Sequence, residues 1–179
     1  NIISDKYPEN QKLSLDHPYN GYPYDSKERA VIKYQLNYCW DPFITDYIVG
    51  EFWNRYIEPL DKFANKYYLD WDKIQIMEKQ GMVIGNHSHN HIAYSLLTED
   101  QLIDDIKYSN LFLEKNIQNK KSLSLFTYPY GTEGSFNDLT INTLKKFNYQ
   151  LAFTSFRADN DSKTDSFKIN RYSTSDLPY

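Results

Sequence analysis

The run Gly81-Met82-Val83-Ile84-Gly85-Asn86-His87-Ser88-His89-Asn90-His91 determines how the rest of this 179-residue sequence is interpreted. Its first part, residues 82–85, is apolar and too short for a helix, which suits a strand buried on both faces. Three of the four histidines in the chain follow that expected strand directly. Because ligands bind at the carboxyl ends of strands in a parallel sheet, this placement predicts a binding site.

The spacing of two histidines suggests what the site binds. His87 and His91 are four residues apart, which places both imidazoles on one face of a helical turn and lets their nitrogens converge on a metal ion. His89 should point elsewhere. The alternative is a polar loop whose histidines only cap backbone groups, which is the more common case for an isolated pair at this spacing. The position directly after an expected buried strand shifts the balance toward a metal site.

The flanking sequence alternates between the periods of helices and strands. Asp41-Pro42 has the form of an N-cap followed by proline, and Thr98-Glu99-Asp100-Gln101 has that of a capping box. Helices are expected over residues 42–58, 71–80, 99–116 and around 141–147, and further strands over residues 123–127, 151–154 and 167–170. This alternation predicts an α/β fold with parallel strands and helical crossovers.

Length, charge and cysteine content exclude several classes of function. The length predicts one domain, and a net charge of −4 with no basic stripe argues against a nucleic-acid partner. No apolar run approaches the ~20 residues that a membrane-spanning helix needs. The single cysteine, Cys39, excludes an intramolecular disulfide and a cysteine-based zinc cluster. Neither the compartment nor the oligomeric state can be predicted from these features.

The histidine run resembles the signature of the polysaccharide deacetylases, also called the NodB-homology domain or carbohydrate esterase family 4. That signature is a short strand followed by Gly-Asn-His-Ser/Thr, two variable residues and a second histidine. The resemblance implies that His87 and His91 bind Zn²⁺ or another divalent transition metal. It also implies that Ser88 supports the loop through hydrogen bonds.

A second stretch, Phe126-Thr127-Tyr128-Pro129-Tyr130-Gly131, is similar to the next signature of that family. The likeness implies that the backbone N–H of Tyr130 helps to form an oxyanion hole and that Tyr128, Pro129 and Tyr130 contact the substrate. When an acetamide is hydrolysed, negative charge collects on its carbonyl oxygen, and a fixed N–H donor stabilises that charge by roughly 3–4 kcal/mol. By itself, Pro-Tyr-Gly could equally be a plain turn.

The resemblance carries expectations about the whole chain. It implies an incomplete or distorted (β/α) barrel in a single domain over residues 1–179, with residues 1–67 forming a loop and long helix specific to the Tyr-Pro-Tyr-Gly subgroup. It also implies hydrolysis of the N-acetyl group of an amino sugar in a glycan or glycan precursor. The alternative is a non-catalytic carbohydrate-binding or interaction module that keeps the deacetylase fold.

Three departures from the family pattern concern the catalytic set. The Thr-Phe-Asp-Asp-Gly segment, which supplies the base and the third metal ligand, is absent; Asp16 is the nearest candidate, and we expect the first βα unit to be missing from this chain. Thr127 stands where many members have an arginine. No histidine follows His91, although Arg171 and Asp176 could fill part of that late role, with Arg171 either catalytic or a structural partner in the last strand. We therefore expect the complete protein to be a deacetylase and this chain to have weak or no activity.

Overall fold

The structure of the chain is a computed structural model that describes residue 22, residues 25–119 and residues 122–176. The chain divides into two compact units, Asn1–Glu51 and Phe52–Tyr179. The boundary falls inside one long helix, α2 (Pro42–Tyr56), whose first turn is capped by the Asp41 carboxylate 2.9 Å from the Phe43 N–H. This helix confirms the prediction for residues 42–58, except that it ends two residues early.

The first unit contains a helix that the sequence did not predict. α1 (Lys27–Tyr34) begins at an N-cap, Ser26, and buries Ala30 and Val31. It continues into a π-helical segment, η3 (Gln35–Cys39). The sequence predicts a loop before the long helix; much of that stretch lies outside the described residues, and α1 occupies part of the rest.

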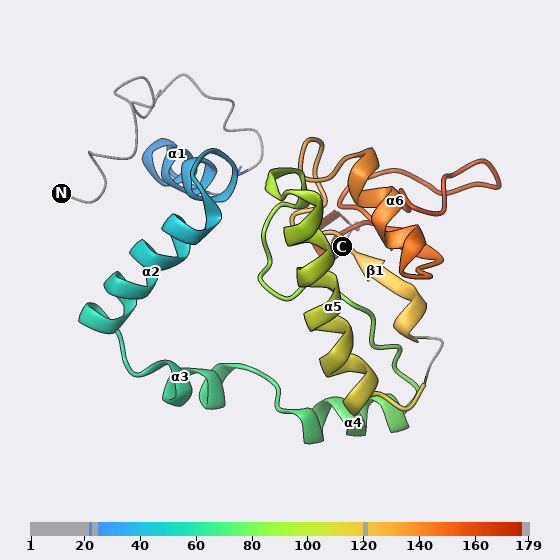
Figure 1. The fold of residues 1–179 in the computed structure, drawn as a ribbon, viewed down its shortest axis with the longest axis horizontal. Helices are drawn as coiled ribbons and strands as arrows, with labels where there is room; N and C mark the ends of the chain where they lie inside the picture. The colour runs from blue at the N-terminus through green and yellow to red at the C-terminus, as the bar shows by residue number, and fades with distance from the viewer. Residues whose placement is uncertain (1–21, 23–24, 120–121, 177–179) are drawn as a thin grey trace. The chain divides into compact units, whose positions relative to one another are not determined.

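The second unit contains the remaining helices, which Figure 1 shows coloured from green to red. They are α3 (Leu60–Tyr67), α4 (Trp71–Lys79), η4 (Tyr94–Leu96), α5 (Glu99–Asn116), η5 (Ser122–Ser124), α6 (Asp138–Lys146) and η6 (Thr174–Asp176). The predicted capping box is confirmed, since Thr98 forms it with Gln101 at the start of α5. Asp70 caps α4 in the same way, by accepting from the Lys73 N–H. None of the helices among the described residues is both long and apolar enough to cross a membrane.

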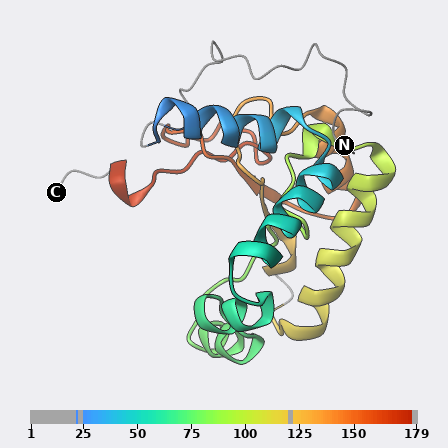
Figure 2. The same ribbon diagram turned by 90° about the vertical axis from the view of Figure 1, so that its left-hand side faces the viewer.

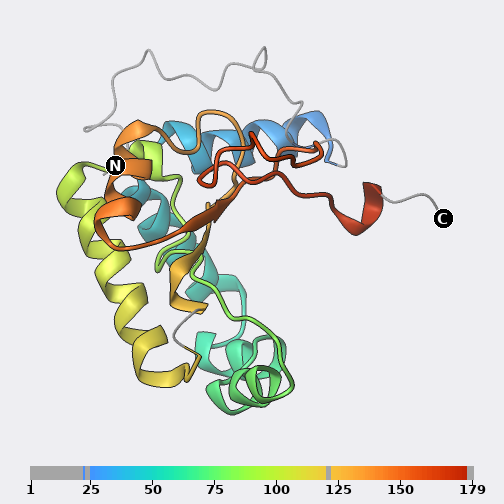
Figure 3. The same cartoon turned by 90° about the vertical axis from the view of Figure 1, so that its right-hand side faces the viewer.

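Two helices cover the core of this unit. α6 lies beside the N-terminal half of α5, where Lys146 Nζ is 3.0 Å from Glu99 Oε1 (Figures 1 and 3). α4 lies near the other end of α5 (Figure 2). There Gln75 of α4 donates a hydrogen bond to the Asn116 carbonyl. The core between helices and strands is formed by buried apolar residues: Tyr94, Leu97, Leu102, Ile106, Phe126, Tyr128, Ile141, Leu144, Tyr149, Ala152 and Phe167.

The strands are parallel, as predicted, and very short. β1 (Leu125–Thr127) pairs with β2 (Leu151–Phe153), with Phe126 opposite Ala152. Single bridges extend the pairing on both sides, from Asn86 to Phe126 and from Phe153 to Ile169. The spatial order is therefore residue 86, β1, β2 and residue 169, with α5 and α6 as the crossovers on either side of β1. The predicted strand over residues 167–170 is reduced to the Ile169 bridge.

The prediction of a buried strand over residues 82–85 is wrong. Residues 82–85 are described and form no strand pairing; the bridge to β1 is made by the next residue, Asn86. Met82 and Val83 are 51% and 57% exposed. The end of the run does lie beside β1, since the next residue, Asn86, forms a bridge with Phe126. The apolar composition predicted burial, but burial on both faces needs packing partners, and the described part of the chain does not place them there.

Candidate metal and substrate site

The histidine loop, residues 87–91, is not helical, which corrects the expectation of a helical turn. Ser88 and His91 have φ angles of 69° and 53°, in the left-handed region that side chains other than glycine rarely adopt. The His91 N–H donates to Ser88 Oγ at 2.9 Å, which agrees with the supporting role expected of Ser88. Such backbone strain persists only where the surroundings hold it in place.

Asn86 joins the histidine loop to the sheet. Its backbone N–H donates to the Leu125 carbonyl, and its own carbonyl accepts from Thr127 N–H, at 2.9 and 2.8 Å. The side chain is buried, with its Nδ2 2.6 Å from Tyr149 Oη and its Oδ1 accepting from Ser88 N–H at 2.9 Å. Because Asn86 bonds on both sides, His87 leaves the sheet in a fixed direction.

Asp105 of α5 holds the middle of the histidine loop. Its carboxylate, only 4% exposed, accepts hydrogen bonds from the backbone N–H groups of His89 and Asn90, both at 2.9 Å. The Tyr94 hydroxyl donates to the same carboxylate at 2.7 Å. Burial, together with the neighbouring Asp105, raises the pKa of Tyr94, so this phenol stays protonated and remains a donor.

This geometry brings the two predicted metal ligands together. The ring centroids of His87 and His91 are 4.8 Å apart, with 77° between the ring planes. His87 Nδ1 lies 2.8 Å from the Thr127 carbonyl oxygen, which places the proton on Nδ1 and leaves the Nε2 lone pair for a metal. Desolvation and the adjacent His87 lower the pKa of His91, which favours the neutral imidazole that binds metals.

His89 takes a different direction from this pair. Its ring stacks on Phe112 of α5 at 5.8 Å with an interplanar angle of 5°, and it lies 5.8 Å from the Tyr108 ring. Within the part of the chain that the structure describes, no cluster of three His, Cys, Asp or Glu side chains could hold a metal ion. The imidazole pair therefore fits two positions of a metal site, and the described residues do not supply a third.

The turn after β1 places Tyr130 beside the histidines. The Tyr130 ring lies 5.0 Å from the His91 ring, and its φ of 61° is again left-handed. Gly131 follows with a φ of 66°, and a Cβ at this position would lie 2.8 Å from Ser155 N. Only glycine permits this close approach of the turn to the chain after β2.

The other two predicted substrate contacts face the core instead. Tyr128 and Pro129 are buried, and the Tyr128 ring stacks on Phe136 at 4.0 Å. Burial raises the pKa of Tyr128, and its protonated hydroxyl donates to the Phe167 carbonyl at 2.9 Å. In this structure the two residues anchor the turn that presents Tyr130.

Two pockets contain residues that the sequence indicates as site candidates. One, of about 310 Å³, has His87 on its wall together with apolar and aromatic side chains; it is lined by Trp71, Gly85, Asn86, His87, Ser88, His89, Ser109, Phe112 and Leu113. The other, of about 350 Å³, contains Arg171 and Asp176. Neither histidine of the pair lines the second pocket, and the catalytic role expected of Arg171 stays a prediction.

Sequence reasoning missed Asp105, although a signal was present. The buried face of α5 consists of Leu102, Asp105, Ile106, Ser109 and Leu113. A carboxylate in the middle of an apolar stripe needs buried partners, because an isolated buried charge is very costly. Asp105 and Ser109 could have been identified as partners of the histidine loop on that ground.

Comparisons with known proteins identify the family of the chain. A family model described as polysaccharide deacetylase matches residues 43–152, and the chain belongs to that family. Among solved structures, the chain is similar to the Streptococcus pyogenes deacetylase PplD in complex with acetate, with 23% identity and a TM-score of 0.52. The alignment covers 58% of this chain and 44% of that one, so the chain spans less than half of its structural neighbour. The chain matches no curated protein.

These comparisons confirm the family and the fold class that the two signatures indicated. The likeness to PplD is one of fold, and the parallel pairing with helical crossovers is compatible with an incomplete barrel of the deacetylase type.

Proposed function

We propose that this domain hydrolyses the N-acetyl group of an amino sugar in a glycan or glycan precursor, with a zinc ion held by His87 and His91. The observation that carries the proposal is the imidazole pair, 4.8 Å between centroids, in which His87 Nδ1 is 2.8 Å from a backbone carbonyl. Membership of the polysaccharide deacetylase family, which generally uses a divalent metal, supports the reaction class. Another divalent transition metal would suit the same ligands.

The residues of this chain contribute orientation and charge stabilisation. A divalent cation bound here would polarise the acyl carbonyl and activate a water molecule at neutral pH. The backbone N–H of Tyr130 is the proposed donor to the oxyanion, and the Tyr130 ring, 5.0 Å from His91, would form one wall of the sugar site. Tyr128 and Pro129 would act indirectly, by holding the Tyr130 turn against the core.

The third ligand and the base belong to the same proposal. Catalytic zinc normally has three protein ligands, and water attack needs a proton acceptor. We propose that a carboxylate outside the described residues supplies both functions, because the described residues offer no third ligand beside His87 and His91. Asp16, the candidate within this chain, lies outside the described residues. Without such a carboxylate, this chain should release little acetate.

Zinc titration with a competing chromophoric chelator tests the proposal. The wild-type chain should bind one equivalent of zinc, and His87→Ala or His91→Ala should each weaken binding by more than about 10-fold, because removing a ligand costs more than removing its outer partner. His89→Ala is the matched control, since its ring stacks on Phe112, away from the pair. It should bind zinc as the wild type does.

Two results would contradict the metal site. One is a wild-type chain that binds no zinc, and the other is an equal loss of affinity in all three histidine variants. A chain that binds N-acetylated oligosaccharide but no zinc would instead favour the alternative, a carbohydrate-binding module that keeps the deacetylase fold.

A further inference from the structure

The second pocket, which the proposed function does not use, combines two guanidinium groups with an aromatic ring and hydroxyls. It has a volume of about 350 Å³ and is lined by Ser155, Arg157, Arg171, Tyr172, Ser173 and Asp176. Its residues follow β2 and the Ile169 bridge, so it lies at the carboxyl ends of two parallel segments. Figure 3 shows this part of the chain, in red, beyond the arrowhead of β2.

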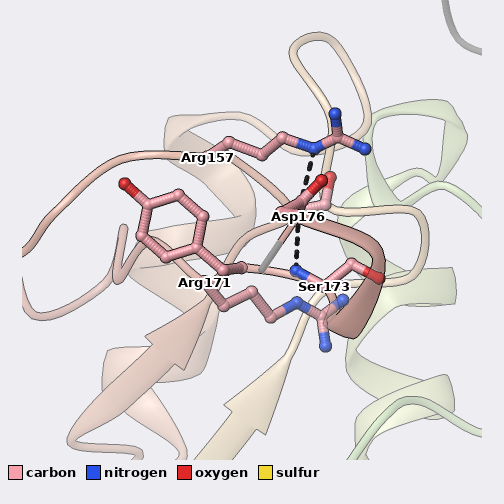
Figure 4. A pocket seen from close by; sticks show the side chains of 6 residues that line it. Arg157, Arg171, Ser173 and Asp176 are labelled. Carbon is pink, nitrogen blue, oxygen red and sulfur yellow. Dashed lines mark hydrogen bonds and ion pairs between the residues drawn. The ribbon is translucent and has the colours of Figure 1, made fainter. Parts of the chain in front are cut away.

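The charges in this pocket do not cancel. Arg157 Nε is 3.2 Å from Asp176 Oδ2, and the same oxygen accepts from the Ser173 N–H at 2.7 Å (Figure 4). Among the described residues, the Arg171 guanidinium has no carboxylate within ion-pair distance, and it carries no dashed line in Figure 4. Two positive groups thus face one negative group, in a chain whose net charge is −4.

The backbone around Arg171 is held in place, so the pocket is a defined site. The Arg171 N–H donates to the Phe156 carbonyl at 3.0 Å. Asn170 and Asn160 exchange two hydrogen bonds of 2.9 Å, from each residue to the other. Tyr172, half exposed, is tied to Asp159 through its hydroxyl at 3.2 Å. The planar guanidinium holds its donors in a rigid fork, so less freedom is lost for each hydrogen bond to a planar anion.

The pocket is connected to the candidate site through the turn after β1. Ser155, on the wall of the pocket, donates its backbone N–H to the Gly131 carbonyl at 2.9 Å. The residue before Gly131 is Tyr130, whose ring lies 5.0 Å from that of His91. The Tyr130 turn and this pocket, hereafter the arginine pocket, are therefore joined by the hydrogen bond between Ser155 and Gly131.

We propose that Arg171 and Arg157 bind an oxyanion carried by the glycan itself, a uronic-acid carboxylate or a phosphate, and that Tyr172 supports the adjoining sugar ring. The inference rests on the proposed function, since it assigns that function to acidic rather than neutral N-acetylated glycans. Arginine binds carboxylate and phosphate through parallel N–H donors, and the exposed ring of Tyr172 offers an apolar face for a sugar.

Isothermal titration of the full chain with three probes tests this assignment. The probes are a hyaluronan tetrasaccharide with carboxylates, N-acetylglucosamine 1-phosphate, and neutral chitotetraose. One of the anionic probes should bind about tenfold tighter than chitotetraose at low salt, and added NaCl should remove the difference. The probe that shows the preference identifies the anion, and equal binding of all three overturns the proposal.

Variants locate the effect in the pocket. Arg171→Gln should lose the preference for the anionic probe and keep chitotetraose binding, whereas Arg171→Lys should keep part of the preference. Arg55→Gln, which removes the same charge from α2, is the matched control and should behave as the wild type. Asp176→Asn should strengthen anion binding a few-fold, because it releases Arg157 while an amide oxygen can still accept from Ser173. A preference that survives Arg171→Gln, in a variant with an unchanged thermal melt, also overturns the proposal.

The zinc titration separates this inference from the proposed function. A chain that prefers the anionic probe but binds no zinc at His87 and His91 would retain the arginine pocket and lose the deacetylase assignment. A chain that binds zinc at those histidines without any anionic preference would retain the assignment and lose the pocket.

Discussion

The Asp105 carboxylate accepts two successive backbone N–H groups, those of His89 and Asn90, and a hydroxyl from Tyr94, while only 4% of the residue is exposed. The Asn90 side chain donates to it as well, at 3.0 Å. A buried charge is tolerated only when it is satisfied in this way. The position of the histidine pair therefore depends on a residue that would not itself touch the metal or the substrate.

Replacing Asp105 should disorder the histidine loop. Asp105→Asn keeps the shape of the side chain but replaces one acceptor oxygen with an NH₂ group facing N–H donors. We expect a loss of about 3 kcal/mol in the free energy of unfolding, together with weaker zinc binding. Urea denaturation and the chelator titration measure these two effects.

The neighbouring aspartate supplies the control for that variant. Asp104 is exposed and makes one distant ion pair with Lys107, at 4.0 Å. Asp104→Asn should change the free energy of unfolding by less than about 0.5 kcal/mol. Similar losses for the two variants would show that the buried hydrogen bonds of Asp105 do not set the stability of the loop.

At the level of single elements, helices α2, α4, α5 and α6 and strands β1 and β2 were predicted, whereas helices α1 and α3 and the exposure of residues 82–85 were not. Asp70 and Thr98 mark the starts of α4 and α5 by local side-chain hydrogen bonds that depend on neighbours three residues away. Residues 82–85 carry the composition of a buried strand, yet Met82 and Val83 are exposed. Strand formation and burial depend on partners distant in sequence, which a local pattern cannot reveal.

The geometry of the candidate site shows the same limit. The signatures located His87, His91 and Tyr130, but the histidines meet through left-handed loop residues rather than the helical turn that their spacing suggested. A left-handed backbone at a residue other than glycine cannot be recognised from the amino-acid composition. The arginine pocket could not be predicted from the sequence either, because Arg157 and Asp176, which form an ion pair in it, are nineteen positions apart in a stretch without a motif.

The glycines in the turn between β1 and α6 test how much close packing of this turn contributes to the free energy of unfolding. Gly131→Ala must keep a φ of 66° and place a Cβ 2.8 Å from the Ser155 backbone nitrogen. We expect a loss of about 3 kcal/mol or more, from left-handed strain and overpacking together, measured by thermal or urea denaturation. Gly134, three residues later in the same turn, provides the comparison.

Gly134 has a φ of 81°, but a Cβ added to it would meet no atom within 4 Å. Gly134→Ala should therefore cost only the conformational strain, about 1 kcal/mol. If the two alanine variants lose the same stability, the close approach of the Gly131 turn to the chain after β2 does not matter energetically.

For the whole molecule, the division into two units bears on the expectation of a single domain. The buried apolar cluster runs from Tyr94 to Phe167, entirely within the second unit. His87, Tyr130 and the arginine pocket belong to that unit too. We propose that the deacetylase-like domain has its stability and its site in this part, with residues 1–40 as an addition to it.

A shortened chain that begins at Asp41 tests this proposal, because it keeps the N-cap of α2 and all of the second unit. Its thermal midpoint should lie within about 5 °C of the full chain, since the core cluster is intact, and about 1 kcal/mol corresponds to a few degrees at this size. Zinc affinity should be unchanged. Loss of cooperative melting would show that residues 1–40 belong to the same folding unit. Loss of zinc binding with melting preserved would show that residues 1–40 complete the metal site, and Asp16 would then be the first residue to replace.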